Sequence, residues 1–491
     1  MQKNVSHVVI AGGGTAGWMT AVALSKLLGK AIKVTLVESD AIGTVGVGEA
    51  TIPPLLTFHK LLGINEQQFM RATKATFKLG IAFESWRDVE QDYIHSFGTT
   101  GQDCWAAGFQ HFWLKAQQHN KAKSFGEYCP ELVAAQQNRF AVLPSQGLNY
   151  AYHLDATAYA AFLRGIAEEH GTQRIEGKIN EVCLDEHSGH IQHLTLASGE
   201  EVKGDFFIDC TGFRARLIGE AMHVGYEDWT HWLPCDSAIA VQTELTREPV
   251  PYTRSIAHEF GWQWQIPLQH RMGNGLVYCE RYTTDGEAKQ LLLDNLPGEP
   301  INEPRVIRFR TGQRRQHWHK NCLAIGLSSG FLEPLESTSI HLIQRSIIRF
   351  MQLFPFGGVD DASINEFNQQ TEHEVLNIRD FIILHYYVTQ RNDSAFWRYC
   401  SKMSIPESLQ HRIDLFKSSG RVFKVPNELF GENSWTQVML GQGLMPESYH
   451  PIVDMMDDDE LSQFLGQIEA RVKRTVSQLP SHEAFLKHHC Y

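Results

Sequence analysis

A glycine-rich turn near the N-terminus constrains the fold of this chain more than any other segment. Residues 7–29 read HVVIAGGGTAGWMTAVALSKLLG, which is an apolar run, a cluster of glycines and an apolar-periodic stretch. This pattern predicts a strand, a tight turn and a helix. The next segment, KVTLVESD at residues 33–40, predicts a second strand that ends in acid. A βαβ unit therefore opens the chain.

The turn satisfies the GxGxxG pattern between the predicted strand and helix. Its glycines permit a tight turn, let the backbone approach a pyrophosphate, and let the helix pack closely on the strand. An acid at the end of the second strand, about 20 residues later, can accept a hydrogen bond from a ribose hydroxyl. These features predict a dinucleotide site, with a purely structural glycine turn as the alternative. The candidate contacts are Gly12, Gly14, Thr15, Ala16, Gly17 and Glu38.

Two further segments favour FAD over NAD as the dinucleotide. GTVGVGEATIPP, residues 43–54, is a second glycine-rich loop that can lie against an isoalloxazine or its diphosphate. DCTGFRAR, residues 209–216, has the form of a late strand-to-turn element that closes over the adenine side. Each could be an ordinary turn by itself, but in this order they predict one flavoprotein. The FAD contacts that we add are Gly48, Glu49, Ala50 and, after a later strand, Gly326.

Composition and charge make several classes of function unexpected. The 491 residues suffice for one large domain or a few ordinary ones. The 44 basic and 56 acidic residues give a net charge of −12 without a sustained basic block, so nucleic acid and anionic membranes are not expected partners. No apolar run is long enough to span a membrane. The cysteines lack a CxxC pair and no export signal is recognised, which predicts a cytoplasmic protein.

The order of patterns along the chain predicts an α/β fold. Strand-like runs such as FFIDCTGF and CLAIGL occur before residue 330, and amphipathic patterns such as DFIILHYYVTQRNDSAFWRYC follow from about residue 361. We expect an FAD-binding Rossmann-like module with an inserted β-sheet and a mostly helical substrate module. The expected bounds are 1–360 for the first module, with substrate-side elements from about 75–200 and 225–310, and 361–491 for the second.

The segment WQWQIP, residues 262–267, gives a WxWxIP pattern and is the most specific signal in the chain. Four other segments accompany it, namely GVGEATIP, TFKLGIAFESW, IDCTGF and FLEPLEST. With the N-terminal glycine turn, they make the chain closely resemble the flavin-dependent halogenases, particularly the tryptophan halogenase family. The resemblance runs from the N-terminus to at least Trp397. It implies a GR2-type fold like that of the flavoprotein monooxygenases.

The resemblance implies a two-component reaction on a small aromatic substrate, expected to be of the indole type. FADH2 from a separate NAD(P)H-dependent flavin reductase, O2 and a halide, bromide or chloride, yield hypohalous acid at the flavin. This acid travels through a tunnel to a lysine beside the substrate, where an electron-rich aromatic carbon is halogenated. A flavin-dependent hydroxylase is one alternative, although such enzymes commonly have Gly-Asp where this chain has Gly326-Leu327. A catalytically silent FAD-binding protein is the other.

Two residues match the catalytic pair of this family. Lys78 in TFKLGIAFESW matches the essential lysine, which polarises the hypohalite as an ammonium or forms an N-haloamine as an amine. Both chemistries need a desolvated site, and the apolar neighbours Phe77, Leu79 and Ile81 predict one. The alternative is a snorkelling surface lysine. Glu336 in FLEPLEST matches the carboxylate that takes the proton lost by the ring, and its alternative role is an acid before a helix.

The resemblance also implies residues that bind the halide and residues that line the wall on the flavin side. Thr338 and Ser339 match residues whose backbone N–H groups bind halide at a helix N-terminus. The family usually has glycine where this chain has Ser339, so a left-handed backbone there would disfavour the serine. Trp262 and Trp264 are expected to line the flavin-side wall. Packing within a strand is the alternative, since period two puts both on one face.

On the substrate side, His95 and Phe97 in HSFG resemble positions that sandwich an indole, and Trp435 is a further stacking candidate. The clamp for an amino-acid backbone found in tryptophan-specific members is not recognised here. A bare indole or a larger indole-bearing molecule is therefore expected rather than free tryptophan. No metal site is expected, because HWH at residues 317–319 and the KHHCY tail, expected to be disordered, lack partners at zinc-like spacing.

Overall fold

The computed structural model describes residues 4–42, 48–142 and 147–490 of the chain. The chain divides into two compact units, each assembled from three segments that alternate along the sequence. The first unit contains Met1–Ala75, Leu154–Asp236 and Arg308–Leu376, and the second contains Thr76–His153, Ser237–Ile307 and Asn377–Tyr491. The expected division into residues 1–360 and 361–491 stays a prediction.

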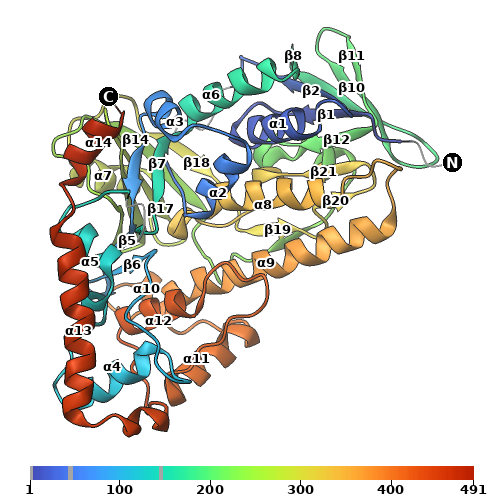
Figure 1. Cartoon of the computed structure of the whole chain (residues 1–491). Helices are drawn as coiled ribbons and strands as arrows, with labels where there is room; N and C mark the ends of the chain where they lie inside the picture. Colours follow the sequence, from blue (N-terminus) through green and yellow to red (C-terminus); the bar gives the residue numbers. More distant parts are fainter. Residues whose placement is uncertain (1–3, 43–47, 143–146, 491) are drawn as a thin grey trace. The chain divides into compact units, whose positions relative to one another are not determined.

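The described part of the first unit is built on a six-stranded sheet (Figure 1). Its order is β20 (Trp318–His319), β21 (Cys322–Ala324), β12 (Phe206–Asp209), β1 (His7–Ala11), β2 (Lys33–Glu38) and β8 (Gln173–Glu176). Neighbouring strands are parallel, except that β20 is antiparallel to β21. The predicted βαβ unit is confirmed, because α1 (Thr15–Leu28) joins the parallel strands β1 and β2.

Helices and two smaller sheets complete the first unit. α1 packs against β1 and β2 and against α6 (Ala156–Glu169) and α8 (Ser339–Gln352). A core cluster that includes Val9, Leu194 and Phe207 joins the main sheet to the sheet of β9–β11. The other elements are α2 (Pro54–Leu61), α3 (Glu66–Thr73), β3 (Gly48–Ala50), β9 (Ile179–Leu184), β10 (Ile191–Leu196), β11 (Glu201–Lys203), β13 (Tyr226–Asp228), β19 (Gly312–Arg314) and β22 (Gly330–Phe331).

The described part of the second unit is built on a seven-stranded sheet, called the larger sheet below. Its order is β18 (Arg305–Arg308), β14 (Ser237–Thr243), β17 (Met272–Tyr278), β16 (Gly261–Pro267), β15 (Thr253–His258), β5 (Gly80–Asp88) and β6 (Gln91–Ser96). Helix α7 (Asp285–Asp294) packs on one face through a cluster that includes Ile239, Leu276 and Leu292. A separate strand, β4 (Thr76–Lys78), pairs antiparallel with β7 (Ala151–Asp155). The predicted sheet insertion is therefore confirmed.

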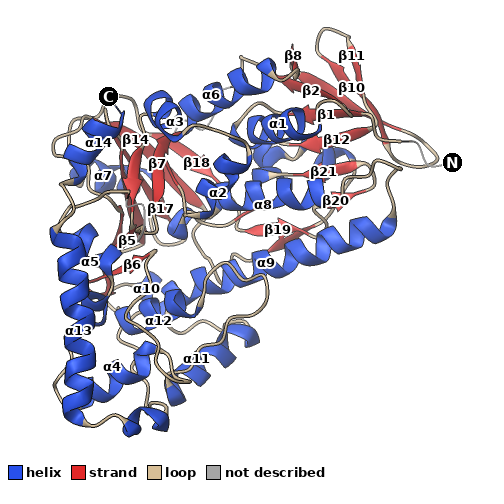
Figure 2. Ribbon diagram, viewed as in Figure 1, coloured by secondary structure: helices blue, strands red, loops and turns tan. Residues whose placement is uncertain are grey.

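Helices dominate the C-terminal part of the chain, as the amphipathic patterns predict (Figure 2). They are α9 (Asp361–Tyr387), α10 (Ala395–Cys400), α11 (Glu407–Ser419), α12 (Glu432–Gly441), α13 (Asp458–Ser477) and α14 (His482–Cys490). In the second unit, α13 packs on α4 (Phe109–Gln118) and α5 (Pro130–Gln136). None of the helices in the described ranges is both long and apolar enough to cross a membrane.

The expectation of a disordered KHHCY tail is wrong for residues 487–490. These residues are the end of α14, and two rings of this helix anchor it to β4. Phe485 and His489 each lie 5.6 Å, centroid to centroid, from Phe77. Although KHHCY is largely polar, the ring of its second histidine, His489, contacts Phe77 and helps to hold the segment in place.

A buried carboxylate ties α8 to α9 in the first unit. Glu374 is 3% exposed and lies 3.1 Å from His341, 3.0 Å from Arg345 and 2.7 Å from Arg349. Burial acts to raise the pKa of Glu374, but the hydrogen bond and charge of His341, the charge of Arg345 and the hydrogen bond of Arg349 outweigh it. They hold this pKa at about 2. The carboxylate is thus kept ionised by three partners on α8.

Glu374→Gln should destabilise the protein by about 3–5 kcal/mol, because it leaves buried cations without their counter-charge. Glu372→Gln, at an exposed position of the same helix, is the matched control and should cost less than about 0.5 kcal/mol. Urea unfolding followed by circular dichroism measures both variants. Because the folded pKa lies below the ordinary value of 4.5, the stabilisation is present above that pH and lost as pH falls toward 2. Equal unfolding midpoints for the two variants would contradict this assignment.

Candidate active site

The turn after β1 brings backbone groups closer together than side chains would allow. Gly12 has φ +107°, and a Cβ added there would lie 2.3 Å from the carbonyl oxygen of Cys210. A Cβ added at Gly17 would lie 1.9 Å from the carbonyl oxygen of Gly12. The turn, the first turn of α1 and the loop after β12 are therefore in direct backbone contact, as the glycine pattern predicts.

The start of α1 and the neighbouring Gly326 form an open site, which we call the cradle; its residues are Gly14, Thr15, Ala16 and Gly326. Gly14 is the N-cap residue, makes no side-chain cap, and has nothing within 4 Å of an added Cβ. Thr15 and Ala16 are the first helical residues. Gly326, with φ +74°, lies against them, since a Cβ there would come within 2.9 Å of that of Ala16. Exposed N–H groups at such a helix start bind phosphate, so the cradle fits the pyrophosphate of FAD.

Glu38 ends β2 against the same turn. A Cβ added at Gly13 would lie 1.5 Å from Glu38 Oε2, so this oxygen faces the glycine backbone. The other oxygen, Oε1, accepts a 2.5 Å hydrogen bond from Arg174 Nε, and Arg174 also donates to Asp40 at 2.6 Å. Arg174 was not predicted from the sequence, because its strand position gives no sign that it faces β2. The arginine orients the acid while leaving Oε2 directed at the turn.

The strand β3 carries the candidate contacts Gly48, Glu49 and Ala50. Residues 43–47, the first part of the second glycine-rich loop, lie outside the described residues. Burial raises the pKa of Glu49 to about 7. The carboxyl group of Glu49 therefore changes its charge close to neutral pH, unlike an ordinary surface glutamate.

Asp209 organises the loop that begins DCTGFRAR. Its carboxylate accepts 2.9 Å hydrogen bonds from the backbone N–H groups of Thr211, Leu217 and Ile218. Burial outweighs these bonds and raises the pKa of Asp209. The loop so formed holds the carbonyl of Cys210 against the glycine turn. Closure over the adenine side stays a prediction, whereas the positioning role of Asp209 is visible in these contacts.

Glu336 lies fully buried in the turn Pro334–Glu336, directly ahead of α8. Ser337 follows with φ +57°, and Thr338 is the N-cap residue without a side-chain cap. Ser339 is the first helical residue. The left-handed backbone thus falls on Ser337, so serine at position 339 is not strained. Backbone N–H groups at this helix start suit an anion.

Lys78 ends β4 in the second unit and is fully buried, as are Phe77 and Leu79. The predicted burial is confirmed and the surface-lysine alternative is excluded. The ammonium lies 5.3 Å from the ring centre of Phe97, within cation–π range. Burial, assisted by the charge of Lys78, lowers the pKa of His153 far below its ordinary value. Lys78 therefore occupies a desolvated site beside an aromatic ring and a neutral histidine.

Trp262 and Trp264 project from one face of β16, with ring centroids 6.2 Å apart. Trp264 covers Gly275, where an added Cβ would lie 2.0 Å from its ring. Trp262 is 1% exposed, and its ring centroid is 6.4 Å from that of Trp86. Both tryptophans therefore pack within the unit, and a role as a flavin-side wall stays a prediction.

Two of the three predicted substrate residues meet at one aromatic cluster in the second unit. His95 on β6 and Trp435 on α12 both contact Phe381, with centroid distances of 5.5 and 4.8 Å. Phe430 stacks on Phe381 at 3.9 Å. The third residue, Phe97, lies instead beside the buried lysine. We call His95, Phe381, Phe430 and Trp435 the aromatic cluster.

The indole of Trp435 is already held by protein groups. Its N–H donates to Glu428 at 3.0 Å, and the guanidinium of Arg412 lies 4.0 Å from its ring centre. A substrate-stacking role for Trp435 stays a prediction. Phe381 is not among the residues predicted from the sequence. Its spacing of four from His385 in DFIILHYY was an available signal, since residues four apart share a helix face.

The histidines of HWH are engaged with protein groups. His317 is buried, which lowers its pKa to about 4, and its Nε2 lies 3.3 Å from Gln313 Oε1. His319 Nδ1 lies 2.8 Å from Gln316 Oε1. Across the ranges that the structure describes, no three His, Cys, Asp or Glu side chains are grouped to hold a metal ion.

The fold and cradle define an α/β protein built for a dinucleotide, and comparisons with known proteins assign its family. The family model described as tryptophan halogenase matches residues 7–458. Tryptophan 6-halogenase SttH from Streptomyces toxytricini is 34% identical, over 98% of this chain and 97% of its own. The solved structure of Xcc4156, a flavin-dependent halogenase from Xanthomonas campestris, is 60% identical, with 99% of both chains covered and a TM-score of 0.98.

A second solved structure, BrvH, a flavin-dependent halogenase from Brevundimonas sp. BAL3, is 44% identical, with 99% of both chains covered and a TM-score of 0.95. The chain therefore belongs to the tryptophan halogenase family. The resemblance seen in the sequence is confirmed, together with the α/β fold and the expectation of an enzyme that depends on FAD.

Two glycine substitutions should separate the structural role of the turn from its cofactor role. Gly12→Ala should lower the stability of the apoprotein, because the left-handed backbone and the nearby Cys210 carbonyl both oppose a Cβ. Gly14→Ala should leave apoprotein stability within about 1 kcal/mol, because its Cβ meets only open space. It should nevertheless weaken FAD binding, measured by flavin fluorescence titration. Unchanged FAD affinity in Gly14→Ala would place the pyrophosphate elsewhere.

Proposed function

We propose that this protein is a two-component halogenase that uses FADH2, O2 and bromide or chloride to halogenate an electron-rich aromatic carbon. The observation that carries the proposal is the fully buried lysine, Lys78, held beside Phe97 in a member of the tryptophan halogenase family. A separate NAD(P)H-dependent flavin reductase supplies FADH2. When bound, FADH2 would donate two electrons to O2, and O2 would take two more from the halide to give hypohalous acid, FAD and water.

The first turn of α8 is the proposed halide position. Its N–H donors come from Thr338 and Ser339, and a helix N-terminus favours an anion through its dipole. The right-handed conformation of Ser339 supports the assignment, because the N–H group keeps its helical direction despite the serine side chain. Serine here is therefore compatible with halide binding.

Lys78 is proposed to activate hypohalous acid for transfer. Its ammonium donates a hydrogen bond to the oxygen and polarises the O–X bond, an interaction strengthened where water is excluded. A bond from halogen to the aromatic carbon then forms as the O–X bond breaks. The carboxylate of Glu336 is proposed to take the proton that the ring loses. The net change is ArH plus HOX to ArX plus water.

The proposed substrate carries an indole without a free amino-acid backbone as its recognition element. SttH is by its name a tryptophan halogenase, so the aromatic class is shared across the family. His95, Phe97 and Trp435 are proposed to contact the ring, supported by the meeting of two of them at the aromatic cluster. The missing amino-acid clamp in the sequence favours a bare indole or a larger indole-bearing molecule over tryptophan.

The reaction itself is tested with the purified protein, FAD, a flavin reductase, NADH, O2 and either bromide or chloride. Indole, tryptophan and larger indole-bearing compounds are the substrates, and mass spectrometry measures the halogen isotope pattern. Halogenated product that requires halide is expected, with indole exceeding tryptophan. An oxygenated product formed without halide would instead assign a hydroxylase, and no product from the whole panel would contradict both enzymes.

Lys78→Ala should abolish halogenation while FAD affinity stays unchanged, because the lysine lies outside the cradle residues. Lys78→Met fills the buried site with a similar volume and tests whether loss of the amine, rather than a cavity, is responsible. Lys402→Ala at an exposed position is the matched control and should keep full activity. Product formation by Lys78→Met at the rate of the unmodified protein would remove this residue from the mechanism.

A further inference from the structure

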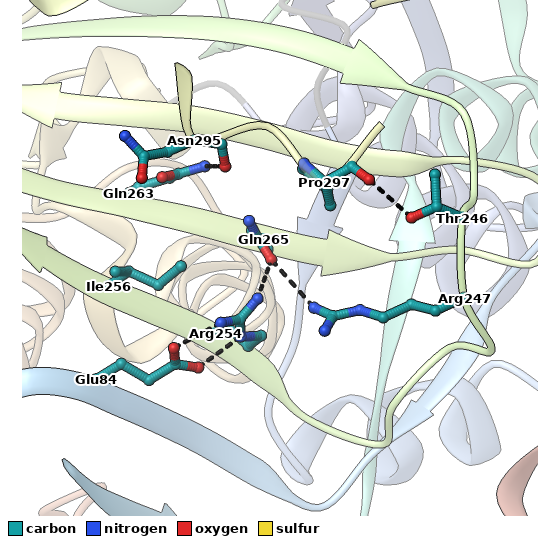
Figure 3. A pocket seen from close by; sticks show the side chains of 9 residues that line it. All are labelled: Glu84, Thr246, Arg247, Arg254, Ile256, Gln263, Gln265, Asn295 and Pro297. Carbon is teal, nitrogen blue, oxygen red and sulfur yellow. Dashed lines mark hydrogen bonds and ion pairs between the residues drawn. The ribbon is translucent and has the colours of Figure 1, made fainter. Parts of the chain in front are cut away.

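The second unit has a cavity of about 440 Å³ that none of the proposed catalytic residues borders. Its lining includes Gln263, which is paired with Leu276 on the α7 face of the larger sheet, and Asn295, which directly follows α7 (Figure 3). Its volume is within the range of small-molecule sites. The polar residues that matter here are Glu84, Arg247, Arg254, Gln263, Gln265 and Asn295.

The strand of the WxWxIP pattern supplies two of these side chains. Successive side chains of a strand point to opposite faces, so Gln263 and Gln265 lie on the face opposite Trp262 and Trp264. Gln263 is fully buried and donates from Nε2 to the carbonyl oxygen of Asn295 at 3.2 Å. One face of β16 therefore carries the two indole side chains, and the opposite face carries the two glutamine side chains.

The positive charge of Arg254 is neutralised by Glu84, and its guanidinium orients the side chain of Gln265. Its Nε and Nη2 donate to the two carboxylate oxygens of Glu84 at 2.5 and 2.6 Å. Its Nη1 donates to Oε1 of Gln265 at 2.5 Å. The Arg254–Glu84 pair therefore adds no net charge to the cavity. All three guanidinium nitrogens of Arg254 donate hydrogen bonds to Glu84 or Gln265.

The direction of the Gln265 amide follows from its partners. Oε1 accepts from Arg254 and, at 3.4 Å, from Arg247 (Figure 3). Arginines only donate, so the oxygen must be the atom facing them and the NH2 group must point away. Gln265 is 3% exposed, and its NH2 group meets no acceptor in the described part of the chain. A nearly buried amide donor is thus presented to the cavity.

Arg247 supplies the charge of the site. It lies in the segment after β14, and its contact with the Gln265 oxygen is a long one. Within the residues that the structure describes, no carboxylate pairs with Arg247. A guanidinium has five donors and stays protonated, so most of them remain available to a ligand. The cavity therefore has one net positive charge and donors from two side chains.

We propose that this cavity binds a small organic carboxylate, with Arg247 and the NH2 group of Gln265 donating to the carboxylate oxygens. The planar, forked geometry of arginine matches a carboxylate, and the remaining volume accommodates the organic body. The site shares no residue with the FAD cradle or with the aromatic cluster, so it adds a ligand position to those of the proposed reaction. Because it uses neither Lys78 nor Glu336, it stands apart from the proposed chemistry.

Isothermal titration of the FAD-loaded protein with sodium benzoate, at constant ionic strength, tests the site. Arg247→Gln should weaken benzoate binding by about tenfold or more, because charge-assisted hydrogen bonds are lost. Arg471→Gln is the matched control, since this exposed arginine also donates to a glutamine oxygen, of Gln102 at 3.3 Å, away from the cavity. Its benzoate affinity should stay unchanged. Equal affinities of the two variants, or no saturable binding to the unmodified protein, would overturn the proposal.

Gln265→Glu provides an independent test with nearly the same shape. The new carboxylate should pair with both arginines and remove the amide donor, so benzoate binding should be lost. A thermal midpoint like that of the unmodified protein shows that the variant is folded. Inorganic phosphate, titrated in parallel, should bind more weakly than benzoate. Phosphate that binds more tightly, or Gln265→Glu that is folded and retains benzoate affinity, counts against a carboxylate site.

Discussion

The close backbone contact at Gly12 is the constraint on which the first unit depends. The carbonyl of Cys210 approaches where a Cβ at Gly12 would be, and the carbonyl of Gly12 itself occupies the space of a Cβ at Gly17. These contacts fix the end of β1, the start of α1 and the loop after β12 in one arrangement. The turn after β21 is held against the start of α1 in the same way, because Gly326 lies against Ala16. Because these glycines hold the neighbouring segments in place, the start of α1 at Gly14 is left open, as a helix N-terminus that binds phosphate requires.

The second unit depends instead on the two faces of β16. Trp262 and Trp264 fill one face, and the glycine at position 275 makes room for an indole ring. Gln263 and Gln265 fill the other face with satisfied oxygens and one amide group directed at a cavity. Because strand geometry alternates side chains strictly, one six-residue pattern specifies both an aromatic and a polar environment. The positions of the tryptophans and of the glutamines are therefore set together by the geometry of the single strand β16.

Buried ionisable groups in the protein are stabilised in different ways. Glu374 remains ionised because three basic partners surround it, whereas burial without such partners raises the pKa of Glu49 to about 7. Lys78 is buried beside Phe97, whose ring face attracts a cation, and the neighbouring His153 is held neutral by burial and by the lysine charge. The side chain of Lys78 is thereby shielded from water, which is the setting that the proposed halogen transfer requires.

The sequence by itself determined the features that depend on neighbours in the chain. Glycine spacing specified the turn at Gly12, alternation specified the faces of β16, and the flanking apolar residues specified the burial of Lys78. Only the tertiary structure decided that Arg174 pairs with Glu38, that Phe381 joins His95 to Trp435, and that α14 packs on Phe77. It also put the left-handed residue at Ser337, two positions before Ser339, where the sequence had raised the question of strain. Periodicity reports which face a side chain occupies, whereas partners distant in sequence are chosen by packing of the whole chain, which no local pattern encodes.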